Sequence, residues 1–348
     1  MACLKDFILV FALFLVFGCL SNTDAGGDDS TESLELPDTS IQKIDAALLD
    51  GEISRGEALE LKLVAGYNPD ALPSKYQSDA FEGRYGLQKT VWDIQQGWEF
   101  LGGDAREKLR PYIVSNSDPE SIFHPSNKRV MAMGPPVEEG DTWACEDVVD
   151  AVKLASVCWS GERTSQVDWV KDALKYSWSS HKDLLGYQPI EWVAVYIKPM
   201  GEYGIASEKD SFGSRRCEIE IREGLDEKIS KSSTAHELFH CFQYAMDYKD
   251  YGNETCWLME ATATWSEHYT YPSHNSEHEY LPRYFRELQR TMIDYDGSHE
   301  YGTYLWYLFL DQKTTGPQEI VDALDRAKTM SGDEAALAVE DFNELFSD

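Results

Sequence analysis

Basic residues are scarce in this chain. It has 31 lysine and arginine residues against 62 aspartate and glutamate residues, a formal net charge of −31 at pH 7. Such an excess of negative charge cannot neutralise the phosphates of a nucleic acid, and an anionic membrane surface would repel it. We therefore exclude nucleic-acid partners. Because the acidic residues are spread along the chain, they indicate a soluble, self-repelling surface rather than a preference for cationic substrates.

The chain begins with an apolar run that is too short to span a bilayer. This run extends over residues 7–17, eleven residues, whereas a spanning helix needs about 20. Lys5 precedes it, so residues 1–19 are predicted to be a signal peptide and the protein to be exported. Residues 20–38, rich in Gly, Asp, Ser and Thr, are predicted to be a disordered tether.

The end of that run resembles the lipobox of bacterial lipoproteins. Val16-Phe17-Gly18-Cys19 carries the resemblance, although Phe17 is larger than the residue usual there. It implies a cell-surface or periplasmic lipoprotein acylated at Cys19, whose membrane contact is limited to that anchor. The alternative is ordinary cleavage near Ala25, which would release a secreted protein.

Histidine is also scarce, with 8 residues in 348, yet two of them form a recognisable pattern. His236, Glu237 and His240 spell H-E-x-x-H. On a helix, residues i and i+4 share a face, so the two imidazoles can bind one metal ion with Glu237 beside it. A catalytic zinc ion takes three protein ligands and leaves the fourth position for water. The pattern therefore predicts a third ligand nearby.

Glu260 is the candidate for the third ligand. Nineteen residues separate it from His240, which is enough for the first helix to end, turn and be followed by an antiparallel helix. Around Glu260 the sequence W-L-M-E-A-T-A (257–263) resembles the W-L-N-E-G-F-A of zinc aminopeptidases, a branch of the gluzincin metallopeptidases. That superfamily has H-E-x-x-H and a glutamate on the following helix. The resemblance implies one zinc ion bound by His236, His240 and Glu260.

Two features leave the branch open. Met259 stands where the aminopeptidase branch has asparagine, and the nineteen-residue spacing is that of the thermolysin branch. The G-x-M-E-N sequence with which aminopeptidases hold a free amine is absent before His236, so an endopeptidase is favoured over an aminopeptidase. The specific motifs cover residues 215–312, under a third of the chain.

The resemblance also implies catalytic roles. Glu237 would take a proton from zinc-bound water and pass it to the leaving amine. Glu267, two turns after the third ligand, could accept a hydrogen bond from a histidine ligand and fix its tautomer; a solvated surface charge is the alternative. A tetrahedral intermediate needs a further hydrogen-bond donor. We predict Tyr301, which resembles the catalytic tyrosine at a helix start in the aminopeptidase branch, with Tyr304 and His299 as rivals.

Five cysteines lie beyond the N-terminal segment, and in an exported protein they are expected to pair. A bridge between Cys241 and Cys256 would join the two ligand helices, and Cys145 with Cys158 is the second predicted pair. Spacing does not determine connectivity, and one cysteine is left over. Three further histidines follow the third ligand: His268, His274 and His278. We predict that they are exposed and do not form a second metal site.

The pattern of apolar and polar residues along the rest of the chain predicts an α+β protein with two parts. Residues 39–110 are predicted to form a helical module. Residues 111–348 are predicted to form a zincin-like catalytic domain with a mixed sheet and a helical C-terminal part. The module starts with helices at 39–49 and 55–65, then 91–101, and is either a prosegment over the cleft or a structural extension. Strands are predicted at 128–133, 190–197 and 217–222, with a loop at 201–213. The last strand alternates with period two, which predicts one solvated face, and it is expected to border the cleft. Further helices are predicted at 147–158, 167–178, 281–292, 301–311, 318–327 and 333–346.

The function favoured by these patterns is zinc-dependent hydrolysis of peptide bonds in a peptide or protein substrate. One alternative is a catalytically silent zinc-binding surface or adhesion protein on the same scaffold. Another is a metallohydrolase that acts on a non-peptide amide or ester. The sequence leaves subsite preference and oligomeric state open.

Overall fold

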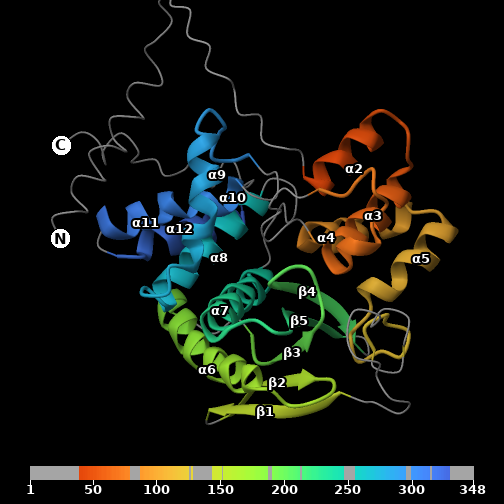
Figure 1. Ribbon diagram of the computed structural model, residues 1–348. Helices are drawn as coiled ribbons and strands as arrows, with labels where there is room; N and C mark the ends of the chain where they lie inside the picture. The colour runs from red at the N-terminus through yellow and green to blue at the C-terminus, as the bar shows by residue number, and fades with distance from the viewer. Residues whose placement is uncertain are drawn as a thin grey trace, which may run out of the picture. The chain divides into compact units, whose positions relative to one another are not determined.

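The computed structural model contains a five-stranded mixed sheet (Figure 1). The structure describes residues 39–78, 87–124, 127, 143–150, 152–186, 190–211, 214–246, 255–294, 299–313 and 316–329. The strand order is β1-β2-β3-β5-β4, in which β2, β3 and β5 are parallel and both edge strands are antiparallel. This mixture of sheet and helices confirms the predicted α+β class. The strands are β1 (Ala144–Asp150), β2 (Val152–Trp159), β3 (Val193–Lys198), β4 (Gly204–Ser211) and β5 (Ser214–Arg222).

Two helices, α6 (Ser165–Leu185) and α7 (Glu227–Tyr244), pack on one face of this sheet (Figure 1). On β5, Ile219 and Ile221 join the apolar core that Leu174 of α6 and Leu238 of α7 also enter. The apolar periodicity predicts the first of these helices, and the H-E-x-x-H pattern predicts the second; both are present. The other helical elements of this region are α8 (Cys256–Thr270), η3 (Ser276–Tyr280), α9 (Leu281–Arg286), α10 (His299–Gly302), α11 (Tyr304–Lys313) and α12 (Gln318–Ala327).

The predicted N-terminal helices are present. Thr39 forms a full capping box with Gln42, and Ser54 accepts a hydrogen bond from the backbone N–H of Glu57. Such caps satisfy N–H groups that the first helical turn leaves without partners. The elements are α2 (Ser40–Leu49), α3 (Arg55–Tyr67), η1 (Pro69–Ala71), α4 (Leu87–Gly97), η2 (Trp98–Phe100) and α5 (Gly103–Ile113).

These helices meet the sheet on the face of β5 opposite α7. Glu218 and Glu220, which point to that face, are buried and accept hydrogen bonds from Ser115, Asn116 and Tyr67. The alternating pattern of β5 predicts a wet face, and this prediction is wrong because polar side chains take the place of water. Contacts place all the described residues in one compact unit.

Five further predictions differ from the structure. Residues 147–158 form the β1–β2 hairpin instead of a helix; Val148 and Val157 are β-branched, and cross-strand pairing holds the segment extended. Residues 201–213 include strand β4 instead of a loop, because β5 pairs with it. Strand 217–222 lies between β3 and β4, so the sheet edge is β4. The predicted helix at 281–292 ends at Arg286, and that at 301–311 is divided into α10 and α11.

Several predictions lie outside the described residues: the signal peptide (1–19), the tether (20–38), the strand at 128–133 and the helix at 333–346. Within the described part of the chain, no helix combines the length and apolarity needed to cross a membrane.

Candidate metal centre

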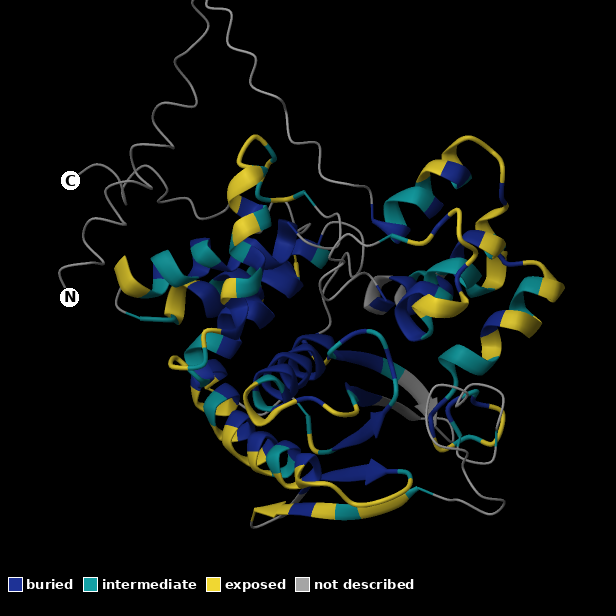
Figure 2. Cartoon of the chain, in the orientation of Figure 1, coloured by how far each residue is buried: buried dark blue, intermediate teal, exposed yellow. Residues whose placement is uncertain are grey.

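Helix α7 carries the H-E-x-x-H sequence through the interior of the protein. Asp226 caps its first turn by accepting from the backbone N–H of Ile229 at 2.8 Å. Every residue from 232 to 244 is buried, and Figure 2 shows α7 almost entirely in dark blue. A helix whose sides are all buried needs small residues for close packing, which the run Ser232-Ser233-Thr234-Ala235 provides. The motif is therefore not part of a solvated surface helix.

Helix α8 packs against α7 and brings Glu260 to the histidine pair. The Nε2 atoms of His236 and His240 are 3.0 Å apart, and each lies 3.2 Å from Glu260 Oε2. Zinc–ligand bonds of about 2.0–2.2 Å in a tetrahedron separate the ligand atoms by roughly 3.3–3.6 Å, a few tenths of an ångström more than the separations found here. The three atoms are therefore spaced nearly as one side of a tetrahedral site. Within the described part of the chain, His236, His240 and Glu260 are the residues whose ligand atoms lie close enough together to hold one metal ion.

The partners of the other ring nitrogens indicate which tautomers are present. His236 Nδ1 lies 2.8 Å from Glu267 Oε1, and His240 Nδ1 lies 2.7 Å from Gln243 Oε1. Carboxylate and amide oxygens accept hydrogen bonds, so each Nδ1 carries the hydrogen and each Nε2 keeps a lone pair. Both lone pairs then face each other and an oxygen of Glu260. Three acceptors at about 3 Å repel one another unless a cation lies among them, so these residues fit a bound metal ion.

The charges of the site favour the same conclusion. Three buried carboxyl groups surround the imidazoles: Glu237, Glu260 and Glu267, each exposing less than a twentieth of its surface. Burial by itself raises the pKa of Glu260, and positive charge on the neighbouring imidazoles of His240 and His236 would outweigh burial and lower it, so an ionised Glu260 needs a cation beside it. Two neutral imidazoles with an ionised carboxylate are the ligand set of several catalytic zinc sites.

Glu237 lies beside the edge strand. A Cβ atom at Gly204, the first residue of β4, would be 2.8 Å from both Cγ and Oε1 of Glu237. Only glycine leaves room for the carboxylate in this position. On the same strand the Ala206 carbonyl accepts a hydrogen bond from Tyr244 at 2.9 Å. Burial, with the charges of Glu260 and Glu237, raises the pKa of Tyr244 well above its usual value, so its hydroxyl remains a donor.

Glu267 and Tyr301 both contact the first histidine. Glu267 binds His236 through one oxygen, and its other oxygen accepts from Ser276 at 3.1 Å. The alternative, a solvated surface charge, is therefore wrong. The buried ring of Tyr301 stacks on His236 with centroids 6.0 Å apart and on Tyr280 at 4.8 Å. Its rival His299 stacks on a different ring, that of Tyr284.

Sequence reasoning missed Gln243 and Gly204. Gln243 lies one helical turn after His240, within reach of its side chain, and this spacing is a signal that could have identified it. For Gly204 no comparable signal exists, because its neighbour Glu237 is distant in the sequence.

The three remaining histidines of the C-terminal part form other contacts. His268 Nδ1 lies 2.8 Å from Glu277 Oε1, and His274 Nδ1 lies 3.1 Å from Ser232 Oγ. Burial lowers the pKa of His274, and the lysines at 228 and 231 lower it further. His278 is largely exposed.

The described residues contain two disulfides. Cys145 pairs with Cys158 across the β1–β2 hairpin, as predicted. Cys241 pairs with Cys217 of β5, so the predicted bridge from Cys241 to Cys256 is wrong and Cys256 belongs to neither disulfide. Because Cys241 follows His240 directly, the bridge attaches the ligand helix to the sheet rather than to α8.

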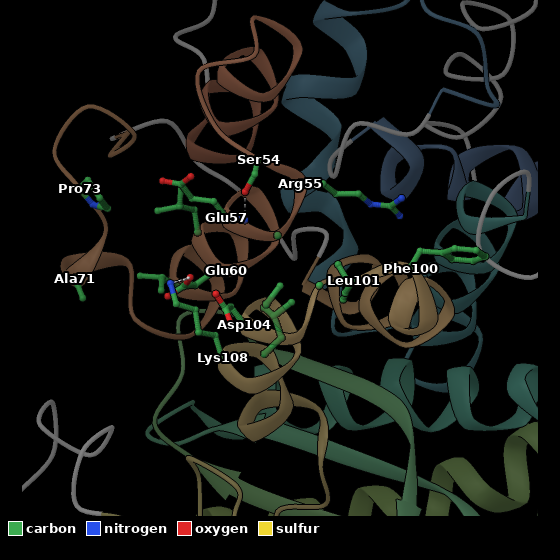
Figure 3. Close-up of a pocket in the computed structure, with 16 residues that line it drawn as sticks. Ser54, Arg55, Glu57, Glu60, Ala71, Pro73, Phe100, Leu101, Asp104 and Lys108 are labelled. Carbon is green, nitrogen blue, oxygen red and sulfur yellow. Dashed lines mark hydrogen bonds and ion pairs between the residues drawn. The ribbon is translucent and has the colours of Figure 1, made fainter.

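A pocket of about 890 Å³ lies in the helical module between α3 and α5 (Figure 3). Its wall includes the ion pair between Glu60 and Lys108, 3.1 Å apart. None of its lining residues belongs to α7, α8 or α10, so the pocket is not part of the metal centre.

Comparisons with known proteins give little further information. Residues 226–333 match a family model described as a family of unknown function, DUF6055. No curated protein matches the chain. A mutant of the M1 zinc metallopeptidase from Deinococcus radiodurans is similar in structure, with a TM-score of 0.36 and 13% identity over 60% of this chain. The aligned part spans about half, 49%, of that peptidase chain.

Proposed function

We propose that the protein is an exported zinc-dependent peptidase with a zincin-like catalytic domain, and that it is an endopeptidase. The observation that supports this most directly is the convergence of His236, His240 and Glu260 on one point, with the lone pairs of both imidazoles turned inward. Glu237, next to His236 on the same helix, is not one of the three. A carboxylate beside the ligands, but not among them, is what a general base requires.

A few residues account for the proposed hydrolysis. A bound zinc ion lowers the pKa of a coordinated water toward neutrality. Glu237, whose carboxylate lies against Gly204, accepts the proton of the attacking water and delivers it to the leaving amine. Tyr301, stacked on His236, is the proposed hydrogen-bond donor to the oxyanion.

Export is proposed from the N-terminal sequence, with lipid attachment at Cys19 favoured over release after cleavage near Ala25. Disulfides persist in oxidising compartments and are rare in the cytosol. The bridges Cys145–Cys158 and Cys217–Cys241 therefore support a location outside the cytoplasm.

The test combines metal analysis with peptide cleavage. We expect about one zinc ion per purified chain, lost from Glu260→Ala. In a mixed peptide pool analysed by mass spectrometry, Glu237→Gln should keep its zinc but cleave about 100- to 10,000-fold more slowly, since it lacks a proton acceptor. Glu277→Gln is the matched control, because Glu277 is a buried glutamate bound to His268 outside the proposed machinery.

Each other outcome favours a different function. Zinc binding without cleavage by the unaltered protein would favour the silent binding protein. Hydrolysis of a panel of small esters and amides, but of no peptide, would favour the non-peptide hydrolase. Full peptidase activity in Glu237→Gln would remove Glu237 from the mechanism.

A further inference from the structure

His240 is held by a buried amide on its own helix. Gln243 lies one turn after it, is fully buried, and places Oε1 2.7 Å from His240 Nδ1. We propose that Gln243 is a positioning residue of the metal centre, which fixes the ring orientation and tautomer of His240 so that Nε2 keeps its lone pair for the ion. This inference rests on the proposed zinc site.

Hydrogen bonds on the far side of the amide determine which of its atoms faces the histidine. Gln243 Nε2 lies 3.1 Å from the Met259 carbonyl oxygen and 2.8 Å from Thr262 Oγ1. The Thr262 hydroxyl lies 2.7 Å from the carbonyl oxygen of Leu258, to which it donates its single hydrogen, so it can only accept from the amide. In a flipped amide, Oε1 would face the Met259 oxygen and two acceptors would repel. The amide oxygen is therefore directed at His240.

The tautomer of His240 follows from this orientation. An amide oxygen requires a donor, so Nδ1 of His240 carries the hydrogen. In the opposite tautomer, Nε2–H would point at Glu260 Oε2, 3.2 Å away, and would occupy the direction that the ion needs. Without the Gln243 oxygen, that internal hydrogen bond becomes the better arrangement for His240, and the site closes on itself.

Gln243 also connects two ligands through one side chain. It binds His240 on α7 and the backbone of Met259 on α8, the residue before Glu260. A displacement of α8 relative to α7 would therefore strain both hydrogen bonds of the amide. His236 has a different anchor, the carboxylate of Glu267, so the two imidazoles are oriented independently.

The test measures zinc affinity in Gln243→Met, which keeps the side-chain length but removes both hydrogen-bonding atoms. The metal-free protein is titrated with zinc against a competing chelator. We expect binding to weaken about 10- to 100-fold, the usual effect of removing a group that orients a ligand. The matched control is Gln166→Met: Gln166 is equally buried and bridges the backbones of Arg222 and Gly224 far from the ligands. Its loss should lower thermal stability but leave zinc affinity unchanged.

Ring ¹⁵N NMR shifts of the metal-free protein provide a second measurement that a general loss of stability would not change. His240, assigned with a His240→Gln variant, should show protonated Nδ1 in the unaltered protein and protonated Nε2, or a mixture, in Gln243→Met. If Gln243→Met does not fold, the isosteric Thr262→Val removes one of the two restraints and should weaken zinc binding in the same direction.

Unchanged zinc affinity together with an unchanged tautomer in Gln243→Met, or in Thr262→Val where that variant is used, would overturn the proposal. A protein that binds zinc through this site but cleaves no peptide would contradict the proposed function and leave the role of Gln243 intact. The tautomer measurement decides the proposal even if the unaltered protein binds no zinc.

Discussion

Replacement of Lys198 by methionine should destabilise the protein by about 3–5 kcal/mol, because it leaves a buried charge without its partner. Lys198 Nζ, on β3, lies 2.9 Å from Glu220 Oε2 of β5, and the two side chains expose 2% and 0% of their surface. Nζ also lies 3.0 Å from Asn116 Oδ1 and 3.0 Å from the centroid of the Phe123 ring. These contacts lie between the sheet and the chain segment that follows α5.

The magnitude is set by what remains after the substitution. Glu220 would keep the hydrogen bonds from Asn116 Nδ2 at 2.8 Å and from the Tyr67 hydroxyl at 3.0 Å, but both donors are neutral. Adding Glu220→Gln to Lys198→Met removes the uncompensated charge while an amide oxygen still accepts from one donor. The double variant should therefore be more stable than Lys198→Met alone, as found when both members of a buried pair become neutral.

The assay is urea unfolding at pH 7, followed by fluorescence and circular dichroism. The control is Lys171→Met, whose partner Glu146 lies in a partly exposed ion pair and whose loss should cost under about 1 kcal/mol. If Lys198→Met cost no more than this control, or if the double variant lost the sum of both single losses, the charges would not be coupled in the interior and the reasoning would be wrong.

Two further predictions concern α7 and its neighbours. Gly204→Ala should reduce kcat/KM at least about tenfold with zinc content unchanged, because its Cβ would displace the Glu237 carboxylate; unchanged turnover would contradict the contact. His181 is fully buried, and burial, with a smaller effect of His236, lowers its pKa to about 3. Since its unfolded-state pKa is about 6.5, the unfolded chain takes up the proton first, so stability falls by up to about 1.4 kcal/mol per pH unit below 6.5. His181→Leu does not have this pH dependence, so the stability difference between it and the unaltered protein in urea unfolding should change by about 1 kcal/mol between pH 6.5 and 5.5, because the slope is only half its full value at the unfolded pKa.

The histidine pair could be recognised from the sequence because its geometry is local. Residues four apart on a helix share a face whatever surrounds the helix, so His236 and His240 required only that the segment be helical. The prediction of Glu260 as a ligand required more, because the next helix also had to run back antiparallel to the first. The apolar run around Glu260 was long enough to indicate such a helix. Gln243 lies one turn after His240, so its spacing was a usable signal, whereas Gly204 depends on a contact between distant segments, which no spacing rule describes.

The errors in the sheet have one physical cause. Residues 147–158 have apolar positions that suit a helix as well as a strand. The hairpin forms because β2 pairs with β3 and because Cys145 lies opposite Cys158 in the pairing of β1 with β2. Residues 204–211 become a strand because β5 offers them an unpaired edge. Strand propensity depends strongly on such tertiary context, whereas the helices here are encoded by local periodicity and caps.

The acidic face of β5 bears on the role of the helical module. A period-two pattern tells which side chains are polar, but not whether water or protein satisfies them. Here Glu218 and Glu220 are satisfied by Ser115 and Asn116, which follow the module, and by Tyr67, which belongs to it. A prosegment of residues 39–110 that leaves on activation would take the Tyr67 hydroxyl from Glu220 and uncover the apolar cluster that includes Ile205 of β4. We therefore favour the structural extension over the prosegment, because the module covers the strand on which Gly204 lies.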